Sequence, residues 1–405
     1  MIAAFLLPYP VRGHRAPYLW VYYRLLSSVA EPMLVIAGED YVRDPSAWRD
    51  EGRWELVPGN AHRLGYRIPD AASLAAHEHR FLPAALFDTL LAEAHGNPIA
   101  VFRRLLRERI AAVEAGFEAI FSARGRDLEM ILTWCNCPSL TAAARRHHIP
   151  VVHLEMGPLR WPQYRPTAYL DFSGVNGNTE AARRYQASGL AAEAGLDVAG
   201  LRRFFLVGDG PQPSVPEADL GVVFQVEDDS NLLAFSNGYD NHALLVAAHL
   251  RVPTGRVLVR THPGSLYALK PGWYEVDDSP DSPRFIRRCR KILTINSSLG
   301  VEAMLLDTPV EIMGDCAHRF ILDAADERER AARLAFYLFA YLVPMDLIYE
   351  PDYLRYRLSR PTEREIMIRH LDTYLGGDAW RKGRDETVAM LIRRALSSMN
   401  GCEST

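Results

Sequence analysis

The chain alternates short apolar runs with polar, turn-forming stretches and with longer segments of helical character. Apolar runs of this kind are typical of buried parallel strands. In the first half, we expect strands at 2–7, 33–37, 54–58, 130–134 and 151–154, and helices at about 18–29, 71–121 and 139–147. The long helical stretch is interrupted at Pro83 and at Gly96-Asn97-Pro98. The alternation predicts a doubly wound parallel sheet.

A second series of the same kind follows the glycine- and proline-rich stretch 208–219, which marks a plausible domain boundary. We expect strands at 220–225, 257–259, 292–295 and 310–313, helices at 241–250, 282–288 and 301–306, a buried helix within 334–349 and a helical tail over 362–397. The pattern predicts an α/β protein with two Rossmann-like domains that face a cleft. The expected domains are 1–212, 213–350 and 351–405, the last being helices that pack back on the first domain.

Composition narrows the class of protein. The 405 residues suffice for two cores, and 48% hydrophobic with 24% charged residues is ordinary for a soluble globular protein. A formal net charge of −4 argues against nucleic acid as a partner. Five scattered cysteines do not form a disulfide framework, which favours the reducing cytoplasm. The apolar stretch 1–7 is too short for a signal peptide or membrane span, so at most peripheral membrane association is expected.

The stretch from Val257 to Gly314 contains two of the expected strands, each followed by polar residues. After the second strand, Asn296, Ser297 and Ser298 precede a segment of helical composition that contains Glu302. Ligands bind at the carboxyl ends of parallel strands, and free N–H groups at a helix start attract anions. The alternative for these serines is a plain N-cap on a core helix.

Two more strand ends carry charged residues. The strand at 151–154 ends in Glu155, and Arg160 and Arg165 follow in the next loop, where their guanidinium groups suit an acidic ligand. A loop ion pair between Glu155 and one of these arginines is the alternative. The strand at 220–225 ends in Gln225 and then Glu227-Asp228-Asp229, for which catalysis, a metal site and a helix N-cap at Asp229 or Ser230 all remain open. The sequence contains no Asp-x-Asp, which weakens the metal interpretation.

The first strand of the Val257–Gly314 stretch ends in Arg260, and His262, Pro263 and Gly264 follow. A histidine held by the following proline can assist the departure of a phosphate. A lone histidine at a strand end is more often structural. All these polar groups nevertheless occupy one topological position, the carboxyl end of a strand.

Together these motifs resemble a known family. The pattern Glu155-x-Gly157-x-x-Arg160, the run 225–229, His262-Pro263 and the run 297–303 are similar to the retaining β-Kdo transferases of bacterial capsule and lipopolysaccharide O-antigen assembly. Kdo is 3-deoxy-D-manno-oct-2-ulosonic acid. The likeness is to the single-module domain of WbbB-type chain-terminating enzymes and, more loosely, to the paired modules of the capsule enzyme KpsC. It runs from about Val151 to Gly314.

The resemblance implies a GT-B-like glycosyltransferase that uses CMP-β-Kdo as its donor, without a metal or other cofactor. It implies double displacement with Asp229 as nucleophile, Glu155 as acid/base and His262 near the phosphate. The implied donor-binding residues are Gln225, Arg260, Pro263, Gly264, Asn296, Ser297, Ser298, Glu302, Arg160 and Arg165. The arginines are candidates for the Kdo carboxylate and are not ranked.

The acceptor side is less defined. The loop after the first strand carries Arg12, His14 and Arg15, which we expect to contact a glycan acceptor that is lipid-linked. The chain is expected in the cytoplasm or at the inner face of its membrane, and as one module of a larger polypeptide. Two other functions stay open: a CMP-sialic-acid transferase, and a non-catalytic polysaccharide-binding or assembly protein.

Overall fold

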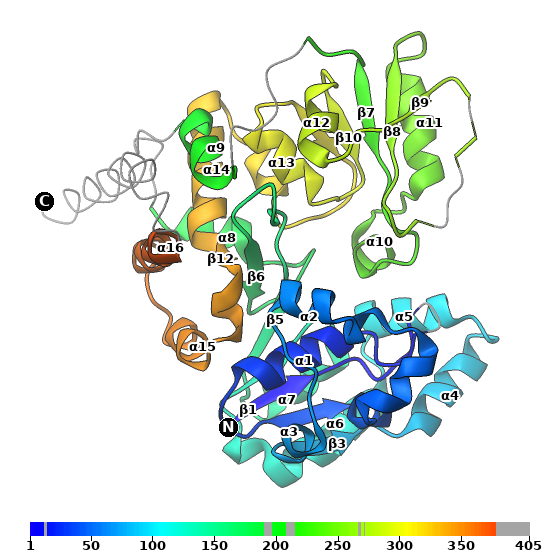
Figure 1. Ribbon diagram of the computed structural model, residues 1–405, viewed down its shortest axis with the longest axis vertical. Helices are drawn as coiled ribbons and strands as arrows, with labels where there is room; N and C mark the ends of the chain where they lie inside the picture. The colour runs from blue at the N-terminus through cyan, green and yellow to red at the C-terminus, as the bar shows by residue number, and fades with distance from the viewer. Residues whose placement is uncertain (12–13, 190–196, 208–214, 266–268, 271, 378–405) are drawn as a thin grey trace, which may run out of the picture. The chain divides into compact units, whose positions relative to one another are not determined.

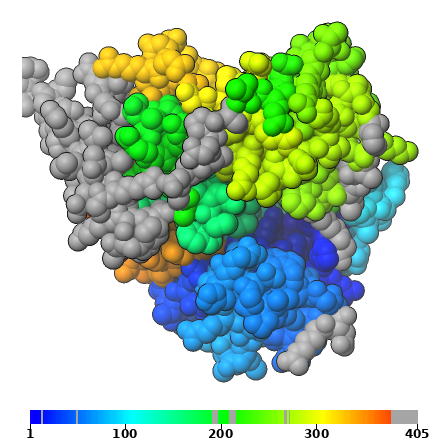
Figure 2. Space-filling view, turned by 45° about the horizontal axis from the view of Figure 1, so that its top comes forward, coloured from blue at the N-terminus to red at the C-terminus, as the bar shows by residue number. Residues whose placement is uncertain are grey.

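The computed structural model describes residues 1–11, 14–189, 197–207, 215–265, 269–270 and 272–377 (Figure 1). The chain forms two compact units. The first contains Met1–Glu155, Asp171–Val175 and Asp346–Tyr356, and the second contains Met156–Leu170, Asn176–Met345 and the chain from Arg357 onward. In Figure 2 the blue and cyan surface belongs to the first unit and the yellow-green surface to the second. The predicted domain boundaries at 212 and 350 stay predictions.

The first unit is built on five parallel strands in the order β5-β4-β1-β2-β3. The central strand, β1, pairs with β2 on one side and β4 on the other, so Ala4 lies opposite both Val35 and Leu132. Strands β1, β2 and β4 are buried along their whole length, as expected of parallel strands covered on both faces. The strands are β1 (Ile2–Phe5), β2 (Leu34–Ala37), β3 (Glu78–Phe81), β4 (Met130–Thr133) and β5 (Val151–Met156).

Helices connect these strands in the predicted alternation. Breaks in the long helical stretch fall where proline and asparagine predict them, because Asn97 caps the next helix through the N–H groups of Ile99 and Ala100, and Pro98 occupies its first turn. The helices are α1 (Leu19–Ser28), α2 (Pro58–Leu64), α3 (Ala71–Ala75), α4 (Ala84–Glu93), α5 (Pro98–Arg107), α6 (Ala111–Arg124) and α7 (Pro138–Arg146).

The prediction of a third strand at 54–58 is wrong. Trp54–Leu56 is a short 3-10 turn, and Pro58 begins α2. The segment does not form a strand because the carboxylate of Glu55 is buried in an ion pair with Arg53. The third strand is β3, inside the stretch predicted to be helical. It lies at the edge of the sheet and is half exposed, so it lacks an apolar run.

The second unit contains a five-stranded parallel sheet in the order β11-β10-β7-β8-β9. Apolar side chains from its three central strands, including Val222, Val259 and Leu293, pack into one core. The four strands predicted from the sequence are confirmed, whereas the exposed two-residue strand β9 was not predicted. The strands are β7 (Leu220–Val223), β8 (Val257–Arg260), β9 (Glu275–Val276), β10 (Ile292–Thr294) and β11 (Val310–Ile312).

The helices expected around this sheet are present, and α12 and α13 pack side by side (Figure 1). The antiparallel pair of β6 with β12 does not belong to this sheet but to the seven-stranded one that contains β1 to β5. The buried helix predicted within 334–349 is present as far as residue 341, as the end of α14 followed by a π-helix (Tyr337–Tyr341), and the chain then continues as β12. The elements are β6 (Thr167–Asp171), α8 (Ala181–Ala187), α9 (Val198–Phe205), α10 (Ser230–Phe235), α11 (Asn241–Arg251), α12 (Ser282–Arg287), α13 (Leu299–Leu305), α14 (Glu327–Phe336), β12 (Leu342–Pro344), α15 (Pro351–Leu358) and α16 (Glu363–Gly377).

The predicted helical tail is confirmed up to Gly377 as α16, and its remainder lies outside the described residues. None of the helices in the described ranges is both long and apolar enough to cross a membrane.

Candidate functional site

The loops that follow β7 and β10 are joined by a pair of amide side chains. Gln225 Nε2 donates to Asn296 Oδ1 at 2.9 Å, and the backbone N of Asn296 donates to Gln225 Oε1 at 3.1 Å. Both residues are buried. Asn231 adds a second link, since its Nδ2 donates to Asn296 O at 3.1 Å and its own carbonyl accepts from Asn296 Nδ2 at 3.2 Å. Two neighbouring strand ends therefore form one fixed platform.

The loop after β8 is tied to the same platform through Asn241 and Glu227. Asn241 Nδ2 donates to Gln225 O at 2.7 Å and to Glu227 Oε1 at 3.3 Å, while Asn241 Oδ1 accepts from Gln225 N at 3.0 Å. The hydroxyl of Ser265 donates to the same Glu227 oxygen at 2.6 Å. Three strand ends that the sequence analysis treated separately are thus brought together in the second unit.

Asp229 has the helix-capping position that the sequence left open. It is the N-cap of α10, and its Oδ1 accepts from Asn231 N at 2.8 Å. Within the described part of the chain, its other carboxylate oxygen makes no hydrogen bond, and the side chain is half-buried. The cap fixes the rotamer and leaves one oxygen for a reacting partner.

His262 lies exposed in the turn after β8, with Pro263 and Gly264. Its Nδ1 accepts from Gly264 N at 3.0 Å, which places the proton of the neutral ring on Nε2. Ser265 N donates to His262 O at 2.9 Å and closes the turn. The turn therefore fixes the orientation of the imidazole ring in the loop after β8.

The serines before α13 are half-buried. Ser297 accepts from Leu299 N through its Oγ at 3.3 Å, whereas Ser298 occupies the N-cap position without a side-chain cap bond. Ser297 therefore has part of the capping role that the sequence left open. The hydroxyl of Ser298 has no partner among the described residues.

There is a steric reason for a glycine at position 300, in the first turn of α13. A Cβ at this position would lie 3.0 Å from Nε2 of His318, which is buried beneath it. Burial lowers the pKa of His318 to about 3, so the ring is neutral, and neither ring nitrogen has a partner among the described residues. His318 could not be identified from the sequence, since nothing in its neighbourhood along the chain marks it.

Glu302 is buried one turn into α13. Its Oε2 accepts from Ser282 Oγ at 2.5 Å. Burial raises the pKa of this carboxyl group to about 7. Four groups act in the opposite direction without cancelling the effect of burial: the hydroxyls of Ser282 and Tyr164 and the charges of Arg160 and Arg260. Ser282 and Tyr164 are further residues that the sequence motifs did not indicate.

The three candidate arginines have different surroundings. Arg165 is 3% exposed and donates to the carbonyl oxygens of Phe204 and Tyr374 at 3.0 Å each, contacts that favour a structural role. Arg160 is exposed and donates to Gly157 O at 3.1 Å through Nε. Arg260 is half-buried and forms an ion pair with Asp277.

Glu155 is the last but one residue of β5, belongs to the first unit and is half-buried. After burial itself, its negative charge is among the causes that raise the pKa values of Cys135 and Tyr349. Both of these neighbours belong to the same unit. Glu155 therefore lies at the carboxyl end of a strand, as the sequence predicted, close to Cys135 and Tyr349.

The expected acceptor loop is only partly described, because Arg12 lies outside the described residues. His14 and Arg15 are both exposed. Arg53, which the sequence analysis missed, donates to the carbonyl oxygens of Arg15 at 2.5 Å and Ala16 at 3.1 Å. Its buried guanidinium thus fixes the end of this loop.

Among the described residues, no three His, Cys, Asp or Glu side chains lie together as metal ligands. Metal independence stays a prediction.

Comparison with solved structures gives similarities of low identity. Thermosulfurimonas dismutans KpsC, described as a beta Kdo 2,7 transferase, is 17% identical with a TM-score of 0.41, covering 57% of this chain and 82% of that one. The Spinosyn rhamnosyltransferase SpnG is 14% identical with a TM-score of 0.31, covering 100% and 99%. The UDP-GlcNAc 2-epimerase of Methanocaldococcus jannaschii is 11% identical with a TM-score of 0.30, covering 82% and 91%.

No protein of curated function matches the sequence. Residues 4–180, which include the end of β1 and the whole of β2 to β5, match the Glycosyltransferase 99 family N-terminal domain. The N-terminal part of the chain is therefore similar to a glycosyltransferase family domain.

Proposed function

We propose that the protein is a retaining β-Kdo transferase that moves Kdo from CMP-β-Kdo to a glycan acceptor in lipopolysaccharide O-antigen or capsule synthesis. The match of residues 4–180 to a glycosyltransferase family domain supports the class of reaction. The observation that carries the site is the hydrogen-bonded platform of Gln225, Asn296 and Asn231, which holds Asp229 at a strand end with one carboxylate oxygen unbonded among the described residues.

The donor binds to the second unit in this proposal. Its phosphate lies over Ser297 and Ser298, whose hydroxyls and neighbouring N–H groups are suitable donors. Glu302 accepts hydrogen bonds from the ribose hydroxyls when it is ionised. His262 Nε2 donates to the phosphate oxygen that leaves with CMP.

The reaction takes place in two displacements, each of which inverts the anomeric carbon. In the first, an oxygen of Asp229 bonds to that carbon, and the bond to the phosphate oxygen breaks with its electron pair going to CMP. In the second, Glu155 takes the proton of the acceptor hydroxyl, whose oxygen attacks the same carbon and releases the Asp229 carboxylate. Two inversions give net retention, and no metal is required by this scheme.

The test is the release of CMP from CMP-Kdo by the purified chain with a panel of short glycan acceptors. CMP-sialic acid is the parallel donor, and a reaction without enzyme corrects for spontaneous donor breakdown. Acceptor-dependent release from CMP-Kdo alone is the expected result. Release from CMP-sialic acid alone would instead support a sialic-acid transferase. Failure to bind CMP or to turn over either donor would leave only a non-catalytic function.

Membrane proximity follows from the acceptor in this proposal. A lipid-linked glycan is presented at the inner face of the cytoplasmic membrane, where a cytoplasmic enzyme associates peripherally. Transfer to a lipid-linked acceptor in vesicles, compared with the same glycan free in solution, tests this part separately.

A further inference from the structure

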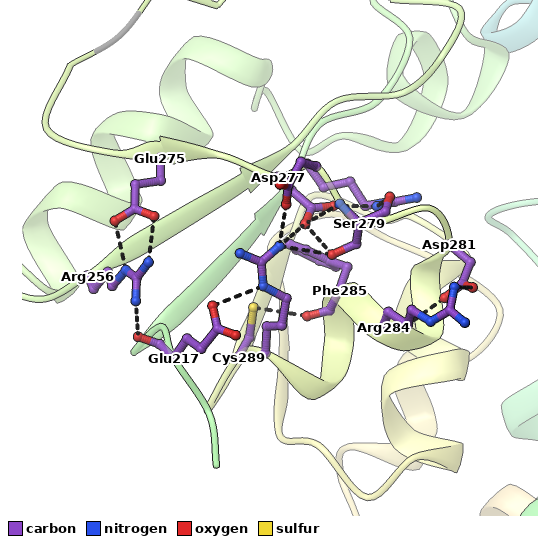
Figure 3. A network of polar contacts seen from close by, with 12 residues as sticks. Glu217, Arg256, Glu275, Asp277, Ser279, Asp281, Arg284, Phe285 and Cys289 are labelled. Carbon is purple, nitrogen blue, oxygen red and sulfur yellow. Dashed lines mark hydrogen bonds and ion pairs between the residues drawn. The ribbon is translucent and has the colours of Figure 1, made fainter. Parts of the chain in front are cut away.

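Arg260 is held at the end of β8 by a buried carboxylate. Asp277 directly follows β9, and its side chain has no exposed surface. Figure 3 shows Asp277 and Ser279 on the segment that leads from β9 toward α12. The carboxylate of Asp277 accepts from Arg260 Nη1, from Ser279 Oγ at 2.6 Å and from Ser279 N at 3.1 Å. Arg288 Nη1 donates to it as well, at 3.1 Å.

The strand pairing brings the two residues together. Asp277 N donates to Val259 O at 2.8 Å and so extends the pairing of β8 with β9 by one step. This bond sets Asp277 beside Arg260 at the carboxyl end of the sheet. A buried carboxylate is tolerated only when it is paired and fully hydrogen-bonded, which the donors around Asp277 achieve.

The ion pair uses only one end of the Arg260 guanidinium. Nη1 donates to Asp277 and, at 3.1 Å, to the backbone oxygen of Ser279, while the ring of Phe285 lies 5.6 Å from the guanidinium carbon. Nε and Nη2 make no hydrogen bond to the residues that the structure describes. The side chain as a whole is 23% exposed, so it stays accessible to a ligand.

The position of this edge relates it to the proposed donor site. The positive charge of Arg260 is one of the influences that lower the pKa of Glu302, so the two side chains lie close enough to interact. Arg165 has no comparable edge, since it donates to two backbone carbonyls in the interior. Of the two remaining arginines, only Arg260 has an ion pair with a buried carboxylate among the residues that the structure describes.

We propose that Asp277 is a positioning residue that fixes Arg260 so that the Nε–Nη2 edge binds an anionic group of the donor. The inference rests on the proposed function. Two donor groups share the required chemistry, the phosphate of CMP and the carboxylate of the acidic sugar. A guanidinium edge offers either of them two parallel N–H bonds.

The test measures the dissociation constants of CMP and CMP-Kdo, and the KM and kcat for CMP-Kdo, in Asp277→Asn. Asparagine keeps the size of the side chain and removes the charge that orients Arg260. The expected result is an affinity for CMP-Kdo about tenfold weaker, as for the loss of one well-placed charged hydrogen bond, with kcat changed less than KM. Equal weakening for CMP assigns the phosphate, and weakening for CMP-Kdo alone assigns the sugar carboxylate.

Three comparisons separate positioning from a general structural effect. Arg260→Lys keeps the charge without the two-pronged edge and is expected to weaken donor binding to a similar degree. In the Arg260→Lys background, Asp277→Asn is expected to add little, because it acts through Arg260. Glu217→Gln removes the negative charge that faces Arg288 at 3.2 Å on the outer side of the same network and is expected to leave donor binding unchanged.

Two results would overturn the inference while leaving the proposed function intact. One is a wild-type donor affinity in Asp277→Asn. The other is a loss of donor affinity on Asp277→Asn that is equally large in the wild type and in the Arg260→Lys background. A wild-type chain that neither binds CMP nor turns over CMP-Kdo would refute the proposed function, and the inference with it. If Asp277→Asn does not fold, Arg260→Lys decides alone, and unchanged donor affinity in that variant refutes the role of Arg260.

Discussion

Gln225 and Asn296 exchange two hydrogen bonds across the ends of β7 and β10, one from side chain to side chain at 2.9 Å and one from backbone to side chain at 3.1 Å. The exchange requires an amide at position 225, because the same side chain donates to one partner and accepts from the other. A carboxylate offers the acceptor but not the donor. The platform therefore depends on a glutamine at position 225.

Gln225→Glu is expected to lower the free energy of unfolding by about 1–3 kcal/mol, because a buried carboxylate oxygen would face Asn296 Oδ1 without a donor. Rotation of the Asn296 amide would restore a donor only by breaking its bond to Asn231 O. Chemical denaturation measures the loss, and CMP affinity should fall with it. Gln186→Glu, at an exposed position of α8, is the matched control. Equal stability of the two variants would contradict the platform.

Asp229→Asn separates the two possible roles of this residue. Asparagine caps helices about as well as aspartate, so the cap of α10 and the stability of the protein should persist. Loss of a covalent nucleophile, in contrast, is expected to reduce transfer by several powers of ten while CMP still binds. Initial rates and CMP titration provide the measurement.

Asp240→Asn provides the control for Asp229→Asn, since Asp240 caps α11 in the same way, accepting from Ala243 N at 2.7 Å. It should retain both stability and activity. If Asp229→Asn kept more than about a tenth of the wild-type rate, Asp229 would have only its capping role.

The sequence predicts those parts of the fold whose signal is local. Buried parallel strands such as β1 and β4 are continuous apolar runs, and Asn97-Pro98 defines a helix start by its own chemistry. Strands β3 and β9 escape prediction because they are short, half or fully exposed edge strands whose existence depends on a neighbour. The turn at Trp54–Leu56 escapes because its cause is the burial of Glu55 against Arg53.

The same distinction holds for the candidate site. Strand-end positions can be inferred from sequence, and Gln225, Asp229 and His262 do lie in the segments that directly follow β7 and β8. Partners that reach the site from other elements cannot be inferred. Asn241 comes from α11 and Asp277 from the end of β9, and both act through hydrogen bonds that no local motif encodes.

Glu55→Gln is expected to destabilise the first unit by about 3–5 kcal/mol, because the Arg53 guanidinium would remain buried without its countercharge. The pair is bonded at two points, 2.6 and 3.0 Å, and Arg53 also holds the carbonyl oxygens of Arg15 and Ala16. Hydrogen exchange of the amides near residues 14–18 should rise in parallel.

An exposed pair of the same type provides the comparison for Glu55→Gln. Glu108 accepts from Arg104 at 3.4 Å on the surface of α5, and Glu108→Gln should change the free energy of unfolding by less than about 0.5 kcal/mol. Similar losses of unfolding free energy in the two variants would show that the buried Arg53–Glu55 pair contributes no more to stability than an exposed pair.

Glu302→Gln is expected to change how stability depends on pH. The carboxyl group has a pKa of about 7 when folded and an ordinary value near 4.5 when unfolded. Below pH 4.5 both states hold the proton, and between 4.5 and 7 only the folded state does. The favourable contribution is therefore complete at low pH and is lost as the pH rises to about 7, a loss of roughly 3 kcal/mol. Glutamine is always neutral and can still accept from Ser282, so the variant lacks this loss.

The measurement is the free energy of unfolding at pH 5 and at pH 8. The two values should differ in the wild type and converge in Glu302→Gln, whereas Glu327→Gln, at an exposed position, should behave as the wild type. A wild-type difference that survives in Glu302→Gln would place the titrating group elsewhere.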